Sequence, residues 1–389
     1  MPEGKYLGLQ ALIFSLVAAT FSTIYITQPV LPVLRAEFGV SASTASLTIS
    51  AVILGIALAN LPFGMLVDRH PIRPIILLGG SVIVACGLLC AATADLTILI
   101  AARFVQGLFV PALTTCLVVY LVRSLPPERL NVVTGSYVSA TVIGGLGGRL
   151  LGGWIHPPLH WRYAFVTASF LLLAATLSAA RWLPKSESPG EAPEETASFA
   201  GLLRRPELLR IFFVAFGSFF VFSSVFNYLP FYLAGPPFRA STQVITLTYL
   251  SYLVGAFTGP VAGNISNRIG NGATMALGSA MLAAAIAATF IPSLPVIAAG
   301  LAGVCAGFFA VHSAAAGSLN LKLAGSRGRA NSLYVLFYYL GGWVGITASG
   351  QAYRLAGWSG VAMLGILVLV FPFATGVYEM RKGNQESER

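Results

Sequence analysis

Long apolar segments recur along the whole chain, and their length is the strongest constraint on its fold. Each is about 20 residues long, which is the length of a helix that crosses a hydrocarbon core of about 30 Å. Short polar or Gly- and Pro-containing breaks separate them. We expect twelve membrane-spanning segments, at residues 8–32, 44–66, 74–93, 96–121, 133–155, 162–183, 209–234, 241–263, 273–292, 294–320, 331–353 and 358–379.

The composition excludes a soluble protein. Hydrophobic residues make up 56% of the 389 residues, charged residues only 9%, and the mean hydropathy is +0.81. Backbone polar groups inside a bilayer must be satisfied internally, and the segments lack the strict alternation of barrel strands. The sequence therefore predicts an all-α membrane protein with twelve transmembrane helices in contact with the lipid bilayer.

The distribution of Lys and Arg predicts the orientation of the chain. Of 23 such residues, only Arg103 and Arg149 lie in the interior of spans, and only Arg35, Arg162, Arg239 and Arg354 fall on the outer side when the N-terminus is cytoplasmic. Cytoplasmic loops carry the excess of positive charge in membrane proteins. We expect both termini in the cytoplasm and a location in the cell inner membrane. The net charge of +10 is then a topology signal and does not indicate nucleic-acid binding.

Motifs also limit the chemistry. The four cysteines, Cys86, Cys90, Cys116 and Cys305, lie within predicted spans without metal-ligand spacing. The sequence contains no Gly-x-x-x-x-Gly-Lys-Ser/Thr phosphate loop. We expect no metal, no cofactor and no nucleotide motor, so that solute movement draws on an ion gradient or on the gradient of the solute.

The chain is predicted to consist of two related halves. One long hydrophilic stretch separates an N-terminal bundle of six spans (1–184) from a C-terminal bundle of six (209–389), with a cytoplasmic linker at 185–208. Residues 64–69 align with 263–268, and Gly144, Gly148 and Trp161 align with Gly341, Gly345 and Trp358. Duplicated six-helix bundles are the usual architecture of secondary transporters, which expose a midplane site alternately to the two sides.

Two spans carry glycines at four-residue spacing. These are Gly144, Gly148 and Gly152 in the fifth span and Gly255 and Gly259 in the eighth. Such spacing makes a smooth face that a neighbouring helix can approach closely. We expect these faces to slide against helices of the other half during a conformational change; packing alone is the alternative.

Residues 64–74 resemble the loop between the second and third spans of the major facilitator superfamily, whose pattern is Gly-x-x-x-Asp-Arg-x-Gly-Arg-Arg. Gly64, Asp68, Arg69 and Arg73 match this pattern, and two other positions depart from it. The resemblance implies that Asp68, Arg69 and Arg73 latch the cytoplasmic side between conformations. A positively charged loop that only sets topology is the alternative.

Three further motifs resemble those of the same superfamily. Residues 103–107 are similar to its Arg-x-x-Gln-Gly motif, and residues 144–153 to the antiporter motif of the fifth span, in which Arg149 replaces a proline. Residues 25–32 resemble the first span of the drug:proton antiporter branch with twelve spans, particularly its arabinose-efflux-like members. The resemblance implies an antiporter that exports a small organic or amphipathic solute, with protons as the coupling ion. We expect a monomer.

Arg103 and Arg149 are the first candidates for contact with the substrate, because a charge within a span requires a partner, a wet cavity or a ligand. They lie at similar depth in their spans, and no Asp or Glu lies in the interior of any span. Two guanidiniums that face one cavity would bind a carboxylate or phosphate group. In the alternative, each arginine bonds helix carbonyls or extends towards the membrane surface.

His312 is the only histidine within an apolar span, so it is the candidate residue for proton coupling. A hydrogen-bonded core histidine is the alternative. Polar and aromatic residues of the spans complete the candidate substrate site: Tyr25, Gln28, Asn227, Tyr228, Tyr338 and Trp343. Packing or interfacial roles remain open for the aromatic members.

Two other functions remain open from the residues alone. An organic-anion carrier, either a uniporter or an exchanger, would use Arg103 and Arg149. An integral-membrane enzyme acting on lipids would need Asp, Glu or His at the surface, where the outer loops offer little beyond Asp95, His156 and His160. We therefore expect a transporter of a small molecule and not an enzyme.

Overall fold

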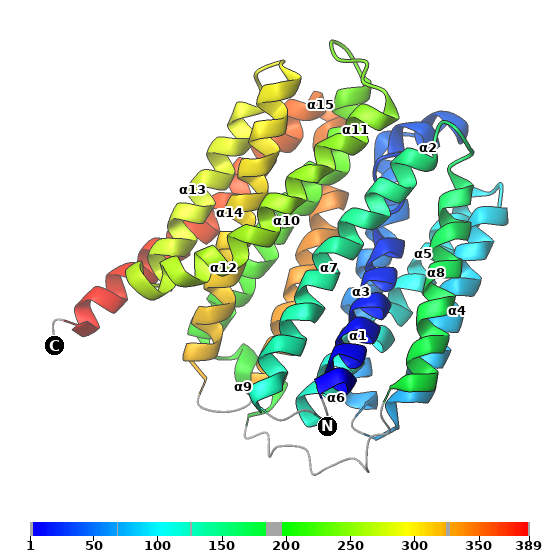
Figure 1. Cartoon of the computed structure of the whole chain (residues 1–389). Coiled ribbons are helices and arrows are strands. Elements are labelled where there is room, and N and C mark those ends of the chain that lie inside the picture. The colour runs from blue at the N-terminus through cyan, green and yellow to red at the C-terminus, as the bar shows by residue number, and fades with distance from the viewer. Residues whose placement is uncertain (1–2, 68, 125–126, 184–196, 324–326, 388–389) are drawn as a thin grey trace. The chain divides into compact units, whose positions relative to one another are not determined.

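The computed structural model describes residues 3–67, 69–124, 127–183, 197–323 and 327–387. Every regular element in these ranges is a helix, as Figure 1 shows. The predicted all-α fold class is confirmed.

The backbone forms two compact units. Unit 1 comprises Met1–Phe38 and Leu47–Pro193, and unit 2 comprises Gly39–Ser46 and Glu194–Arg389. Unit 1 contains α1 (Glu3–Ile24), α2 (Leu31–Glu37), most of α3 (Ala42–Leu66), α4 (Ile72–Ala92), α5 (Leu96–Leu113), α6 (Thr115–Ser124), α7 (Pro127–Ile155) and α8 (Arg162–Trp182). Unit 2 contains the start of α3, α9 (Phe199–Leu203), α10 (Pro206–Ala234), α11 (Thr242–Thr248), the 3-10 turn η1 (Tyr249–Ser251), α12 (Tyr252–Ile269), α13 (Asn271–Ala288), α14 (Leu294–Leu321) and α15 (Arg327–Ser387).

The predicted spans coincide with helices. Ten stretches of the described ranges are long and apolar enough to cross a membrane. One of them, Gly328–Gly383, covers the last two predicted spans. The backbone leaves helical geometry between these spans, at Ala356 and at Gly357, where φ is +57°. The fifth predicted span lies on α7, a helix of 29 residues outside these ten stretches. The chain thus has a multi-pass, all-helical membrane fold.

Two predicted spans are interrupted helices. The fourth consists of α5 and α6, which are separated at Thr114. The eighth consists of α11 and α12 with η1 between them. Apolar composition predicts that a segment crosses the membrane but not where its helix is interrupted.

The glycines of α7 bring this helix into close contact with α1. A Cβ added at Gly144 or Gly148 would overlap the backbone of α1, and one added at Gly152 would overlap the backbone of Ile26, in the turn that follows α1. The expectation that these glycines face a helix of the other half is therefore corrected, because their partner belongs to the same unit. Small residues on both sides, Ala18 and Ser22 on α1 among them, explain the close approach.

The glycines of unit 2 show a similar pattern. A Cβ added at Gly341 or Gly345 of α15 would overlap the backbone of α10, which repeats the packing of α7 on α1. On α12, a Cβ added at Gly255 would overlap the ring of Phe309 on α14. A Cβ added at Gly259 would have no atom of a neighbouring element within 4 Å. The expected close contact with the other half is thus corrected for Gly255, which packs against its own unit, whereas for Gly259 it stays a prediction.

One acidic residue lies deeper than the sequence suggested. Glu379 ends the last predicted span, and its side chain is only 9% exposed in α15. Its Oε2 accepts a hydrogen bond from Lys322 Nζ at 2.6 Å, and Arg210 Nη2 lies 4.0 Å from Oε1. This buried ion pair connects the ends of α14 and α15 within unit 2.

Candidate functional site

The candidate residues of unit 1 gather where α1 ends. This helix ends at Ile24, and a turn through Tyr25 and Gln28 follows before α2 begins. The last carbonyls of a helix have no partner inside it. Inside a membrane, where water is absent, they need donors from side chains.

Arg103 of α5 supplies several of these donors. It is completely buried, its Nη1 donates to Thr23 O at 2.7 Å, and its Nη2 donates to Ile24 O. Its Nε donates to Thr48 O on α3 at 2.9 Å, and Gln106 accepts a further bond at 2.7 Å. Arg103 therefore caps the end of α1 and ties it to α3. For Arg103 the structure thus shows the alternative interpretation of the sequence, in which the arginine bonds helix carbonyls instead of a substrate.

Arg149 of α7 lies against the turn that follows α1. Its guanidinium carbon is 3.9 Å from the centre of the Tyr25 ring, its Nε donates to Gln28 Oε1 at 2.7 Å, and its Nη1 donates to Gly145 O at 2.7 Å. Arg149 is 1% exposed, whereas Tyr25 is half-buried. Three residues that the sequence suggested for the substrate site are thus in contact, and we name them the Arg149 cluster.

The two arginines occupy different surroundings at the end of α1. The guanidinium of Arg103 lies among the carbonyls of α1 and α3, whereas that of Arg149 lies on an aromatic ring and a side-chain amide and bonds one carbonyl of its own helix, Gly145 O. A shared two-arginine pocket was the expectation from the sequence. Arg103 serves helix capping in this structure, so the candidate site of unit 1 rests on Arg149.

His312 of α14 lies in an aromatic cluster of unit 2. Its Nδ1 is 2.9 Å from the hydroxyl of Tyr334, and which of the two donates depends on the tautomer. Its ring is nearly parallel to the ring of Phe308, with the two centroids 5.9 Å apart. The centroid of the Tyr338 ring lies 5.2 Å from that of His312, and the Tyr338 ring stacks on Phe219 with centroids 3.8 Å apart. His312 and Tyr338 are half-buried. The sequence candidates His312 and Tyr338 therefore belong to one site, the His312 cluster.

The other candidates of unit 2 lie apart from these rings. Asn227 is fully buried, and its Nδ2 donates to Ser46 Oγ at 2.7 Å, while its Oδ1 has no hydrogen-bond partner among the described residues. Tyr228 is also fully buried, and its hydroxyl donates to Ile346 O at 2.9 Å. These contacts indicate a packing role for Tyr228. Trp343 is half-buried on α15. Asn227 is the member of this group with unused polar capacity.

The expected latch residues are only partly described. Asp68 lies outside the described residues, and Arg69 is exposed. Arg73 donates through Nε to Leu183 O at 2.9 Å, and so caps the end of α8. This contact ties the first turn of α4 to α8 within unit 1.

A further polar cluster, which the sequence did not predict, lies at the start of α8. Glu37 accepts hydrogen bonds from Trp161 Nε1 at 2.5 Å and from Arg162 Nη1 at 2.6 Å, and His160 Nε2 lies 3.6 Å from it. Arg162 also donates to Thr93 O at 3.0 Å. Partial burial raises the pKa of Glu37, but the hydrogen bonds from Trp161 and Arg162 outweigh it, so its pKa lies below the ordinary value.

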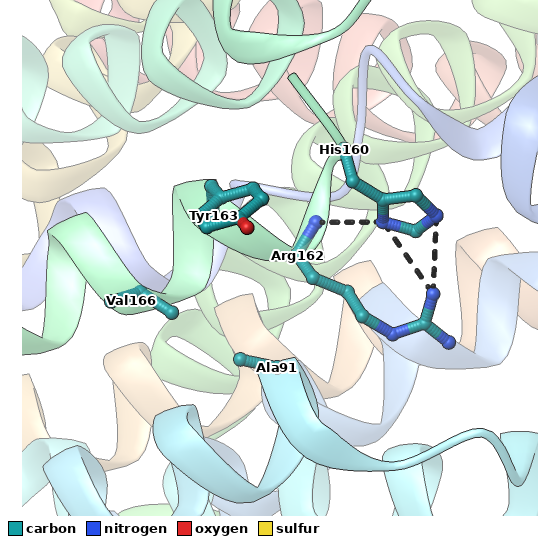
Figure 2. A pocket seen from close by; sticks show the side chains of 5 residues that line it. All are labelled: Ala91, His160, Arg162, Tyr163 and Val166. Atoms are coloured by element: carbon teal, nitrogen blue, oxygen red, sulfur yellow. Dashed lines mark hydrogen bonds between the residues drawn. The ribbon is translucent and has the colours of Figure 1, made fainter.

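Figure 2 shows His160 and Arg162 among the residues that line an open pocket. The volume of this pocket is about 410 Å³. Ala91, Tyr163 and Val166 complete its lining. The guanidinium of Arg162 is held by Glu37 and Thr93, so this cluster fixes the start of α8. Trp161 and Arg162 lie 124 and 125 residues from Glu37 in the sequence. No local spacing could have predicted it.

The fold agrees with comparisons to known proteins. A family model described as the Major Facilitator Superfamily matches residues 13–346. The chain belongs to the major facilitator superfamily. This superfamily consists of membrane transporters, so the chain is a transporter with a small-molecule substrate, and the alternative of a lipid enzyme is excluded.

Relatives of this superfamily member are found across bacteria. The inner membrane transport protein YnfM of Escherichia coli (strain K12) is 30% identical over 382 residues, which cover 96% of this chain and 90% of the relative. The uncharacterized MFS-type transporter YybF of Bacillus subtilis (strain 168) is 28% identical over 358 residues, which cover 90% and 87%. Both similarities extend over nearly the whole chain.

A solved structure shows the same fold. The bacterial homologue of the human lysosomal transporter Spinster, in an inward-facing and unoccupied conformation, superimposes with a TM-score of 0.77 at 17% sequence identity. The match covers 98% of this chain and 97% of that one. At this identity the similarity concerns the fold of this major facilitator superfamily member and not its substrate.

Proposed function

We propose that the chain is a secondary active transporter of the cell inner membrane, with both termini in the cytoplasm. It exports a small organic or amphipathic solute by alternating access in exchange for protons. The observation that carries the proposal is the Arg149 cluster. A buried guanidinium stands where the antiporter motif of the superfamily has proline, and it contacts a half-buried tyrosine and a glutamine. Such groups bind the polar end of an organic solute.

Proton coupling is assigned to the His312 cluster. The imidazole is half-buried and bonded to a phenol, and histidine changes its charge near physiological pH. The rings of Phe308 and Tyr338 beside it suit the apolar part of a solute. In this proposal the chain acts as a monomer of the drug:proton antiporter branch, since each cluster is built within one chain.

The test is a proton-flux measurement on the purified protein in liposomes that carry a pH gradient. The probes are ethidium as a lipophilic cation, p-toluenesulfonate as an aromatic anion and arabinose as a neutral sugar. At least one probe is expected to discharge the pH gradient faster in liposomes that contain the protein than in liposomes without it. The proposal fails if no probe changes the gradient and every probe only equilibrates down its own concentration gradient.

A second candidate, an organic-anion carrier, is favoured by Arg149 specifically. A guanidinium held by Gln28 and Tyr25 is a donor group suited to a carboxylate or sulfonate. This carrier would exchange p-toluenesulfonate across liposomes at equal rates with and without a pH gradient. Exchange that stops when the gradient is removed would exclude it.

A further inference from the structure

An open groove of about 710 Å³ runs along α1, α7 and α8 within unit 1. On α1 its lining extends from Gly8 to Ser22, a distance of about 21 Å at the rise of an α-helix. Most of the lining is small and apolar, as at Ala18, Gly147 and Ala174. Because α1 and α8 are membrane spans, the groove lies within the hydrocarbon layer.

The repeat shows that helix packing does not require this groove. Gly144 and Gly148 of α7 meet Ala18 and Ser22 of α1. At the matching contacts of unit 2, Gly341 and Gly345 of α15 meet Phe216 and Phe220 of α10. Two small residues along the groove thus correspond to two phenylalanines in the second half.

The same register extends to the next turn of the helix. Ser15, which lines the groove, corresponds to Phe213 on α10. The ring of Phe213 contacts Phe216 at 6.1 Å, Phe337 at 5.3 Å and Phe371 at 6.1 Å. In unit 2 aromatic rings therefore pack where unit 1 has small residues and open space.

A groove of this kind needs an occupant, because surfaces without contacts lose the dispersion attraction that close packing provides. Inside the bilayer the available material is the hydrocarbon of lipid chains. A length of about 21 Å is more than half of a hydrocarbon core of about 30 Å, so one acyl chain fits along it.

The end of the groove on α8 carries groups that suit a lipid headgroup. Trp182 lines the groove at the last residue of α8, and tryptophan is enriched at the membrane surface. Arg181 precedes it, three residues after Ser178 of the lining, and so lies on the same side of the helix. Arg181 is exposed and forms no hydrogen bond or ion pair with a described residue. Its guanidinium can bind a phosphate group.

We propose that this groove binds one acyl chain of a glycerophospholipid, with the lipid phosphate at Arg181. The site is independent of the Arg149 and His312 clusters and of the direction of transport. Unit 1 keeps small residues along α1 for this lipid, whereas unit 2 fills the matching positions with its own rings.

Native mass spectrometry of the purified full-length protein tests the proposal, with dioleoylphosphatidylglycerol as the probe. The wild type is expected to retain one lipid. Ser15→Phe and Ala174→Phe fill the groove from opposite sides and are expected to lower retention at least fivefold. Ser81→Phe, on an exposed position of α4 outside the groove, is the matched control and is expected to retain the lipid as the wild type does.

The headgroup contact is tested with Arg181→Gln. This variant is expected to lower retention of dioleoylphosphatidylglycerol at least threefold but to leave retention of dioleoylglycerol, which has no phosphate, unchanged. The proposal is overturned if Ser15→Phe and Ala174→Phe retain the lipid as the wild type does. It is also overturned if Ser81→Phe loses as much lipid as these two variants. If Ser15→Phe fails to fold, Ala174→Phe decides. Binding of glycerol 3-phosphate as tight as that of the whole lipid would exclude the acyl-chain site.

Discussion

Three arginines of unit 1 serve different purposes, although each lies in or beside a membrane helix. Arg103 bonds the last carbonyls of α1, Arg162 bonds Glu37 and the end of α4, and Arg149 contacts side chains of the turn after α1. Capping bonds to carbonyls hold helices in place. Contacts with side chains such as Gln28 can be exchanged for contacts with a ligand, which is why we assign the substrate to Arg149.

Replacing Arg103 by glutamine is expected to destabilise the fold. The change leaves the last carbonyls of α1, at Thr23 and Ile24, without donors and removes the bond to Thr48 O on α3, at a cost of about 2–5 kcal/mol. Arg103→Lys is expected to rescue only part of the loss, because an ammonium group cannot make the forked bonds of a guanidinium. Thermal unfolding in detergent measures both variants. A melting temperature of Arg103→Gln equal to that of the wild type would contradict the capping role.

Glu37 makes part of the stability depend on pH. Its pKa is lower in the folded protein, so its contribution is present above the unfolded pKa of about 4.3 and is lost as pH falls through the lower folded pKa. At pH 7 we expect Glu37→Gln to melt below the wild type, by the equivalent of about 1 kcal/mol. Melting curves from pH 7 to pH 3 should show the two proteins converging at the acid end. A constant difference over that range would contradict this assignment.

At the scale of elements, close helix contacts depend on which face of a helix each glycine occupies. Gly148 faces the backbone of α1, whereas Gly147, its neighbour, has no atom within 4 Å of an added Cβ. The four-residue spacing of the glycines predicted a close helix contact. It could not predict the partner helix, because many helices in a bundle could present a matching small-residue surface.

Gly148→Ala is expected to weaken the packing of α7 on α1. The added methyl group overlaps backbone, which cannot move aside as a side chain can, and overpacking costs about 1–3 kcal/mol. Gly147→Ala is the matched control, and the helix propensity of alanine makes it neutral or stabilising by up to about 1 kcal/mol. Melting temperatures of the two variants provide the comparison. If both variants melt alike, the contact between α1 and α7 is not as close as described.

At the scale of the whole molecule, the sequence predicted the fold well and the site less well. Span lengths of about 20 residues predict membrane helices directly. The sequence also suggested residues 25, 28 and 149 and residues 312 and 338, which lie together in two clusters. It could not separate Arg103 from Arg149, because the carbonyls that bind Arg103 belong to other helices. For the same reason Tyr334 was not predicted as the partner of His312.

Proton coupling is a property of the complete transport cycle. His312→Gln keeps a polar side chain but cannot carry the proton, so solute movement is expected to continue down its own gradient and to lose its dependence on the pH gradient. Tyr334→Phe removes the hydroxyl bonded to His312 and is expected to shift the pH profile without abolishing transport. Flux measured in liposomes with and without a pH gradient tests both. An unchanged pH dependence of His312→Gln would exclude His312 as the coupling residue.

The measurement that tests the central claim most directly is ligand-induced thermal stabilisation, with the wild type and Arg149→Gln compared across ethidium, p-toluenesulfonate and arabinose. A ligand that binds only the folded protein raises its melting temperature. Our account predicts that at least one probe stabilises the wild type. Arg149→Gln is expected to fold but to lose this stabilisation, while dioleoylphosphatidylglycerol, the control ligand, still stabilises both proteins. Equal stabilisation of both proteins by the same probe would contradict the assignment of the substrate site to Arg149.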